Sequence, residues 1–67
     1  MKIFISYDVK PATIELIEAE LERTQNYDCN FSGIEFEIVR DDDTYINSDD
    51  YDVVALYRRI CSIIEEN

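Results

Sequence analysis

Apolar and polar positions alternate in two short segments of this chain, and alternation of this kind is typical of β-strands with one buried face. Residues 2–7 (KIFISY) are rich in β-branched and aromatic side chains, and residues 34–40 (IEFEIVR) repeat the pattern after the single glycine. Residues 44–46 favour a short third strand that forms a hairpin with the second. The side chains that we expect on the buried faces are Ile3, Ile5, Tyr7, Ile34, Phe36 and Ile38.

Two longer segments repeat their apolar residues at the helical period instead. Residues 10–25 predict a first helix, and Asp8 is suited to cap its amino end. Residues 49–65 predict a second helix with the strongest periodic signal in the chain and with three aspartates in its first turn, where they complement the helix dipole. The expected apolar faces are Ile14, Ile17 and Leu21 in the first helix, and Val53, Leu56, Tyr57, Ile60, Ile63 and Ile64 in the second.

The predicted elements follow the order β-α-β-β-α, with a loop over residues 26–32. Because each element has one apolar face, we expect both helices to pack on one face of a short sheet of two or three strands. A chain of this length fits one domain, so we assign residues 1–67 to a single small acidic α+β domain.

The charge balance limits the class of partner. The chain has six Lys and Arg residues against sixteen Asp and Glu residues, which gives a formal net charge of −10 at pH 7. A protein that binds nucleic acid through its phosphates needs a basic face, so we expect no direct nucleic-acid binding. High net charge also favours disorder, but 46% of the residues are hydrophobic and only one Gly and one Pro are present. We therefore expect a folded domain.

Residue types suited to catalysis are scarce. The absence of His excludes imidazole bases, His-ligated metals and Ser–His or Cys–His nucleophiles. Glu35 and Glu37 lie about 7 Å apart on one strand face by strand geometry. A domain of this size has little room for the cleft that shifts the pKa values of such carboxyl groups. We expect a protein that is not an enzyme and that uses no cofactor.

The cysteines and the amino-terminal segment indicate a cytoplasmic protein. The apolar run at residues 3–5 is too short for the core of a signal peptide or for a membrane span, so we expect neither secretion nor membrane binding. Lone thiols in the reducing cytosol are usually free, and we expect this of Cys29 and Cys61, with a disulfide between them as the alternative.

Residues 41–52 are rich in aspartate and partly match the spacing of a calcium-binding loop. The match fails where the geometry is strict, because Ile46 occupies the position that needs a glycine and Asp52 replaces the bidentate glutamate. We expect a solvated turn followed by an N-capped helix, and we keep a calcium-responsive module as a third functional alternative.

The distribution of the carboxylates supports the functional prediction. The apolar positions account for the fold without them, so most acidic side chains are expected to be free at the surface, in excess of what solubility requires. A rigid array of carboxylates imitates the regular negative charges of a phosphate backbone and fits a basic groove built for DNA or RNA. The expected partner-binding residues are Glu35, Glu37, Asp41, Asp42, Asp43, Tyr45, Asp49, Asp50 and Tyr51, with Glu15, Glu18 and Glu22 as a second acidic stripe.

In size, charge and lack of catalytic motifs the chain resembles phage-encoded inhibitors such as anti-CRISPR and anti-restriction proteins. This resemblance implies an inhibitor or adaptor that mimics nucleic acid and blocks a basic nucleic-acid-handling protein. Tyr45 and Tyr51 are candidate aromatic anchors, because tyrosine is enriched at binding hot spots. The alternative is a homodimeric structural or assembly module that self-associates through Leu16, Ala12 and Ala19, or through the apolar face of the second helix.

Overall fold

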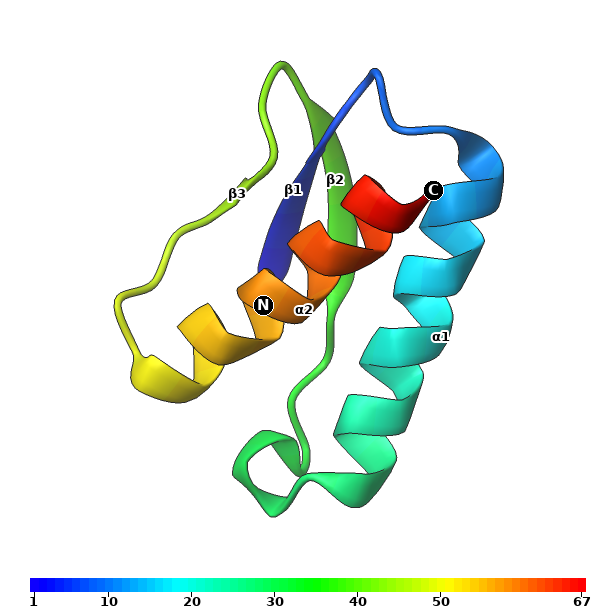
Figure 1. Cartoon of the computed structure of the whole chain (residues 1–67). Helices are drawn as coiled ribbons and strands as arrows, with labels where there is room; N and C mark the ends of the chain where they lie inside the picture. Colours follow the sequence, from blue (N-terminus) through cyan, green and yellow to red (C-terminus); the bar gives the residue numbers. More distant parts are fainter.

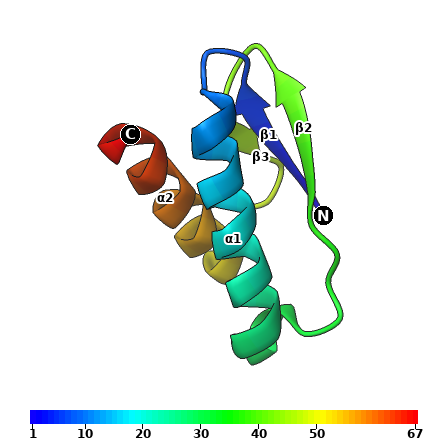
Figure 2. The same cartoon turned by 90° about the vertical axis from the view of Figure 1, so that its right-hand side faces the viewer.

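The computed structural model describes all of residues 1–67, and its elements follow the predicted order. Both helices lie on the same side of a three-stranded sheet, and the other face of the sheet is uncovered (Figure 1, Figure 2). The predicted α+β class and the packing of both helices on one sheet face are confirmed. The elements are β1 (Lys2–Ser6), α1 (Pro11–Tyr27), the 3-10 turn η1 (Cys29–Phe31), β2 (Glu37–Asp41), β3 (Tyr45–Ile46) and α2 (Tyr51–Glu66).

The sheet has the strand order β2-β1-β3, so the first strand of the chain lies in its centre. β1 pairs with β2 in parallel and with β3 in antiparallel orientation, and the predicted hairpin between the second and third strands is therefore wrong. The connection from Asp42 to Thr44 passes over the end of β1, where Ser6 N donates to Thr44 Oγ1 (3.0 Å). With this path, both edges of the buried central strand have a hydrogen-bonding partner. The fold thereby avoids unpaired backbone groups in the interior, which are costly.

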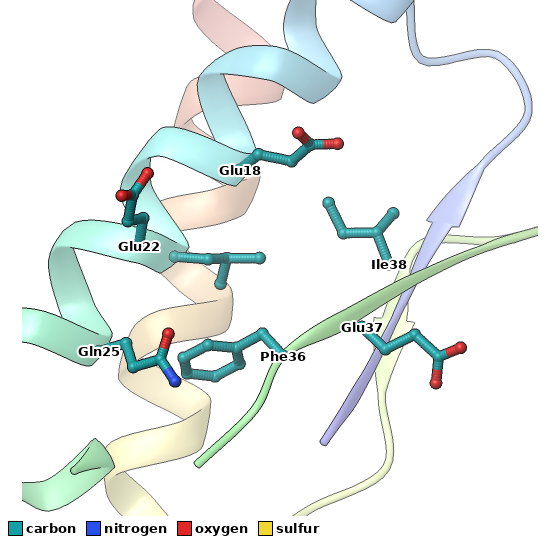
Figure 3. Close-up of a pocket in the computed structure, with 7 residues that line it drawn as sticks. Glu18, Glu22, Gln25, Phe36, Glu37 and Ile38 are labelled. Carbon is teal, nitrogen blue, oxygen red and sulfur yellow. The ribbon is translucent and has the colours of Figure 1, made fainter. Parts of the chain in front are cut away.

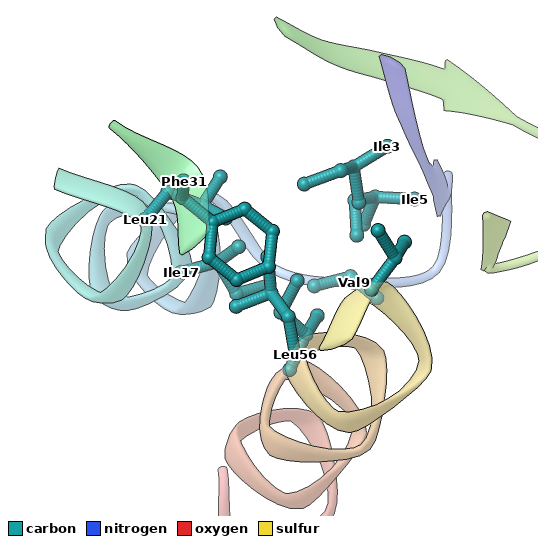
Figure 4. Close-up of a cluster of buried hydrophobic side chains, with 9 residues drawn as sticks. Ile3, Ile5, Val9, Ile17, Leu21, Phe31 and Leu56 are labelled. Carbon is teal, nitrogen blue, oxygen red and sulfur yellow. The ribbon is translucent and has the colours of Figure 1, made fainter. Parts of the chain in front are cut away.

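The core lies between the sheet and the two helices. Ile3 and Ile5 of β1 point toward the helices and are fully buried, and Leu56 of α2 packs in the same cluster (Figure 4). The alternation placed Tyr7 on this face as well, but Tyr7 lies beyond the end of β1 and is 64% exposed, so that prediction is wrong. The nine core residues are Ile3, Ile5, Val9, Ile17, Leu21, Phe31, Val53, Leu56 and Ile60.

The predicted loop after α1 contributes one of these core residues. The Asp28 side chain accepts a hydrogen bond from Asn30 N (3.0 Å) and so begins the short turn η1. The turn directs Phe31 inward, where it is 2% exposed and its ring centre lies 5.7 Å from that of Phe36. Gly33 then adopts φ = +79°, a conformation that glycine tolerates at little cost, and the chain turns back toward β2.

The two helices begin differently. Lys10 is the N-cap residue of α1 and contributes no side-chain cap, so the predicted cap by Asp8 is wrong. Asp8 lies two residues before the N-cap position, in the turn that precedes the helix, where its backbone N–H donates to Ser6 Oγ (3.3 Å). At α2 the Asp50 carboxylate is the N-cap and accepts from Asp52 N (3.0 Å). Asp50 therefore precedes the helix, and Asp52 lies in its first turn.

Helix α1 buries a carboxylate that the apolar period did not reveal. Glu20 is buried and pairs with Arg23 on its own helix and with Arg59 Nη1 on α2 (3.3 Å). Because a buried carboxylate is costly without a cation beside it, these contacts couple the position of α1 to that of α2. Glu20 is also the only acidic residue of the protein that forms a salt bridge.

Candidate protein-binding surface

The uncovered face of the sheet carries a strip of apolar and aromatic side chains. Alternation along β1 directs Phe4 away from the core, opposite to Ile3 and Ile5. Phe4 is in register with Val39 of β2 and with Tyr45 of β3. The Phe4 and Tyr45 rings stack, with centres 4.5 Å apart and planes 7° apart. We call Val39, Phe4 and Tyr45 the sheet strip.

Carboxylates flank the sheet strip along β2. Glu37 and Asp41 lie two residues before and after Val39, so they project from the same face of the strand. The Glu37 side chain is directed away from α1 (Figure 3). Asp42 and Asp43 follow at the end of β2 and are exposed. We call Glu37, Asp41, Asp42 and Asp43, together with the sheet strip, the acidic sheet face.

Hydrogen bonds fix the tyrosine of this surface. The Tyr45 hydroxyl donates to Asp41 Oδ2 (2.7 Å), and Asp42 N donates to Asp41 Oδ1 (2.7 Å). Both bonds favour the charged carboxylate and hold the pKa of Asp41 below its usual value, with the Tyr45 bond contributing most. The bond to Asp41 raises the pKa of Tyr45 in turn, because an anion holds the phenol proton. The Tyr45 ring is thus held at its hydroxyl and on its stacked face.

Tyr45→Phe is expected to raise the pKa of Asp41 toward its usual value, because the variant removes the hydroxyl donor. The folded-state pKa of Asp41 is depressed, so this group stabilises the fold above its unfolded pKa of about 3.9 and loses that contribution as the pH falls through the folded value. An NMR titration of the Asp41 side-chain carbon measures the shift. Tyr51→Phe is the control and is expected to leave this pKa unchanged. An equal pKa of Asp41 in both variants contradicts the hydrogen bond from Tyr45 as the cause of the shift.

The loop that carries Asp42 and Asp43 is held from two sides. Ser6 N donates to Thr44 Oγ1 (3.0 Å), and the Tyr57 hydroxyl of α2 donates to Thr44 O (2.7 Å). Burial raises the pKa of Tyr57, so its phenol stays neutral and keeps its proton for this bond. A loop that is already ordered loses less conformational entropy when a partner binds.

The other acidic residues of the 41–52 region lie elsewhere. Because β3 runs antiparallel to β1, Asp49, Asp50 and Tyr51 come at the opposite end of the sheet from Asp42 (Figure 1). All three are exposed, Tyr51 by 85%. Glu35 precedes β2 at this same end, and its carbonyl oxygen accepts from the terminal amino group (2.6 Å). The expected partner-binding residues are therefore divided between the two ends of the sheet.

The same topology bears on the calcium alternative. Asp41 is the last residue of β2, and Asp52 lies in the first turn of α2, with β3 between them. Residues 41–52 thus run along the sheet and do not close into a loop around a central point. The structure contains no group of three carboxylates or thiols that is placed to hold a metal ion.

A second acidic surface borders a groove between α1 and β2. Glu15, Glu18 and Glu22 are exposed on α1, and Glu18 and Glu22 lie beside this groove (Figure 3). Sequence reasoning missed the groove, because the periods of α1 and β2 say nothing about the space between them. Its volume is about 450 Å³, and it is lined by Glu18, Leu21, Glu22, Gln25, Phe36, Glu37 and Ile38.

Cys29 and Cys61 are both free thiols, which agrees with the expectation from the sequence. Neither helix is long and apolar enough to cross a membrane. Comparison with protein-family models, with curated proteins and with solved structures finds no match to this chain.

Proposed function

We propose that this protein is a small inhibitor or adaptor that binds the basic surface of a nucleic-acid-handling protein and takes the place of nucleic acid there. The observation that carries this proposal is the acidic sheet face, whose carboxylates have no salt-bridge partner within the chain. Carboxylates without a cation in their own chain are available to the arginine and lysine side chains of another protein.

The sheet strip adds aromatic contact area, which charge alone does not provide. Charged surfaces mainly accelerate and orient association, whereas buried aromatic contacts contribute much of the affinity at protein interfaces. Phe4 and Tyr45 stack on neighbouring strands, so they offer contact area with little side-chain entropy left to lose. The hydrogen bond between Tyr45 and Asp41 holds one aromatic side chain and one carboxylate in a fixed relation.

The proposal extends to the setting in which the protein acts. It is a phage protein of the anti-CRISPR or anti-restriction type and works in the cytoplasm of the host cell. It acts by binding alone, without a catalytic step or a cofactor, and it contacts neither nucleic acid nor membrane directly. Its partner is a protein or complex whose basic groove holds DNA or RNA.

Capture from the native host tests this proposal. The protein is immobilised through a carboxy-terminal tag, washed at graded salt concentrations and then treated with DNA or RNA at constant ionic strength. We expect it to retain a basic nucleic-acid-binding protein whose retention weakens with salt and which the added nucleic acid releases, because both ligands compete for one basic surface.

Two bait variants separate the acidic sheet face from net charge. Asp42→Asn with Asp43→Asn removes two exposed charges from this face, whereas Glu65→Gln with Glu66→Gln removes two exposed charges from the last turn of α2. Retention is expected to fall for the first bait and to persist for the second. Retention of no basic protein, or equal retention by both baits, contradicts the proposal.

A homodimeric assembly module is the alternative, and one apolar surface favours it. Leu16 is 48% exposed and borders a groove of about 420 Å³ between α1 and α2, together with Ala19 and Ile63. Self-association through this surface adds apolar contacts that a small core lacks. Sedimentation equilibrium distinguishes the two functions: a dimer that Leu16→Glu converts to a monomer supports the module, and a monomer at both low and high salt excludes it.

A further inference from the structure

β2 forms one edge of the sheet, and alternate residues along it have unpaired backbone groups. The strand order leaves one side of β2 without a neighbour. Glu37 N donates to Met1 O (2.8 Å), and Asp41 O accepts from Tyr7 N (3.0 Å). The backbone groups of Glu37 and Asp41 therefore face the chain of β1. By the two-residue period of a strand, Ile38 and Arg40 direct their N–H and C=O groups outward. No turn, helix cap or side chain of the protein bonds to these groups.

The groove between α1 and β2 lies beside this unpaired edge. Its apolar surface comes from Leu21, Phe36 and Ile38, and Glu18 and Glu22 stand on α1 next to it (Figure 3). Neither carboxylate has a salt-bridge partner within the chain. A side chain that enters the groove from the edge therefore meets apolar surface along its length and negative charge at its tip.

From these neighbouring features we propose that an extended basic segment of the partner protein adds as a fourth strand to the edge of β2. Main-chain hydrogen bonds to Ile38 and Arg40 hold the segment, as in other cases of strand addition. Arg or Lys side chains suit the groove, because their aliphatic stems cover the apolar surface while their charged ends reach Glu18 and Glu22. Apolar side chains on the opposite face of the segment lie beside Val39 and widen the sheet strip.

Charge favours a basic partner over a second copy of this chain at the same edge. Pairing of two copies through β2 brings together the two grooves with their carboxylates Glu18, Glu22 and Glu37, and these like charges repel. The formal charge of −10 on each chain adds to this repulsion. Arg40 is the one cation of β2, and its charge is already counted in this total; its guanidinium is held by Tyr7 O (3.2 Å) and Val9 O (2.6 Å). The basic character of the segment rests on the proposed function.

Binding of a short peptide of alternating Arg and Val, blocked at both ends, tests the inference. Fluorescence anisotropy measures its affinity, and amide NMR shifts of the protein are expected to change most at Ile38 and Arg40. Two further peptides carry N-methyl groups, one on its Val residues and one on its Arg residues. Alternate N–H groups of an added strand face its neighbour, so one methylated peptide is expected to lose at least about tenfold in affinity while the other keeps it. Equal binding by all three peptides, or equal loss in both methylated ones, overturns strand addition.

Variants of the protein test whether the groove contributes to binding of the peptide. Glu18→Gln with Glu22→Gln is expected to weaken binding of the unmodified peptide about fivefold, because two solvent-exposed ion pairs are lost. Glu65→Gln with Glu66→Gln makes the same change in net charge on α2 and is expected to leave the affinity nearly unchanged. Equal weakening by the two pairs overturns the role of the groove.

The outcomes separate this inference from the proposed function. If host capture depends on Asp42 and Asp43 but the peptide does not bind at the edge of β2, the inhibitor proposal stands and strand addition falls. If the peptide adds at the edge but capture yields no protein that nucleic acid releases, strand addition stands and the mimicry proposal falls.

Discussion

Leu56→Ala is expected to unfold a large fraction of the protein at room temperature. Leu56 is fully buried in the cluster where α2 packs against the sheet and α1. Truncation of a buried leucine costs about 3 kcal/mol, because the cavity that remains closes only in part. A core of this size supplies at most about 3–5 kcal/mol of net stability, so a single cavity removes most of it. Urea unfolding followed by circular dichroism measures the loss.

Leu16→Ala is the matched control, since it makes the same substitution on the other helix. Leu16 is 48% exposed, so its truncation is expected to cost less than about 1 kcal/mol. Both variants exchange leucine for alanine within a helix, and the difference between them therefore reports burial and not helix propensity. Similar losses of stability in the two variants contradict the packing of α2 on the sheet.

Charge reversal in the loop after β2 is expected to have the second large effect. Asp42→Lys with Asp43→Lys is expected to slow association with the captured partner at least about tenfold at low salt, with a smaller effect on dissociation. Both side chains are exposed on a loop that hydrogen bonds to Thr44 hold in place. Lysine replaces attraction by repulsion where the basic surface approaches. Stopped-flow or surface-plasmon measurements over a range of salt concentrations give both rates.

Glu65→Lys with Glu66→Lys changes the net charge by the same amount and serves as the control. These residues lie in the last turn of α2, on the side of the helices and away from the uncovered sheet face (Figure 2). At about 0.1 M salt, where screening limits charge effects to about 10 Å, this variant is expected to slow association far less than Asp42→Lys with Asp43→Lys does. If both variants slow association equally, net charge and not the acidic sheet face steers the encounter.

The second helix shows how much a local pattern determines. It begins at Tyr51, where the sequence predicted 49, and ends at Glu66, where the sequence predicted 65. All the residues that it buries belong to the predicted apolar face. A helical period is a property of one segment, so it requires no knowledge of the rest of the chain. The same holds for Ile3 and Ile5, which simple alternation placed in the core.

Strand pairing and the position of Phe31 depend on segments that are far apart in the sequence. A short loop between two strands favours a hairpin, but β3 pairs instead with the side of β1 that β2 leaves free, where unpaired backbone groups would be costly. Phe31 is buried because η1 packs beside α1 and directs this ring into the core, and nothing periodic in residues 26–32 marks it. Both features are set by tertiary packing, which a local pattern does not contain.

The candidate surface, like the fold, is predictable from the sequence in its local features only. The acidic residues follow from the sequence, and the alternation that buries Ile3 also turns Phe4 outward. Their grouping does not follow, because only the direction of β3 separates Asp42 from Asp50. The α1/β2 groove does not follow from the sequence either, because it depends on how the segment between α1 and β2 places these two elements. Residue types indicate the chemistry of this surface, and the topology decides which residues act together.

The central place of β1 has a consequence for synthesis on the ribosome. β1 is made before every other element of the domain, yet its hydrogen-bonding partners lie at residues 37–46, and α2, which covers its apolar face, follows them. Ile3 and Ile5 therefore stay exposed until nearly the whole domain has emerged from the ribosome. During this interval the surplus of carboxylates keeps the nascent chains apart and limits their aggregation.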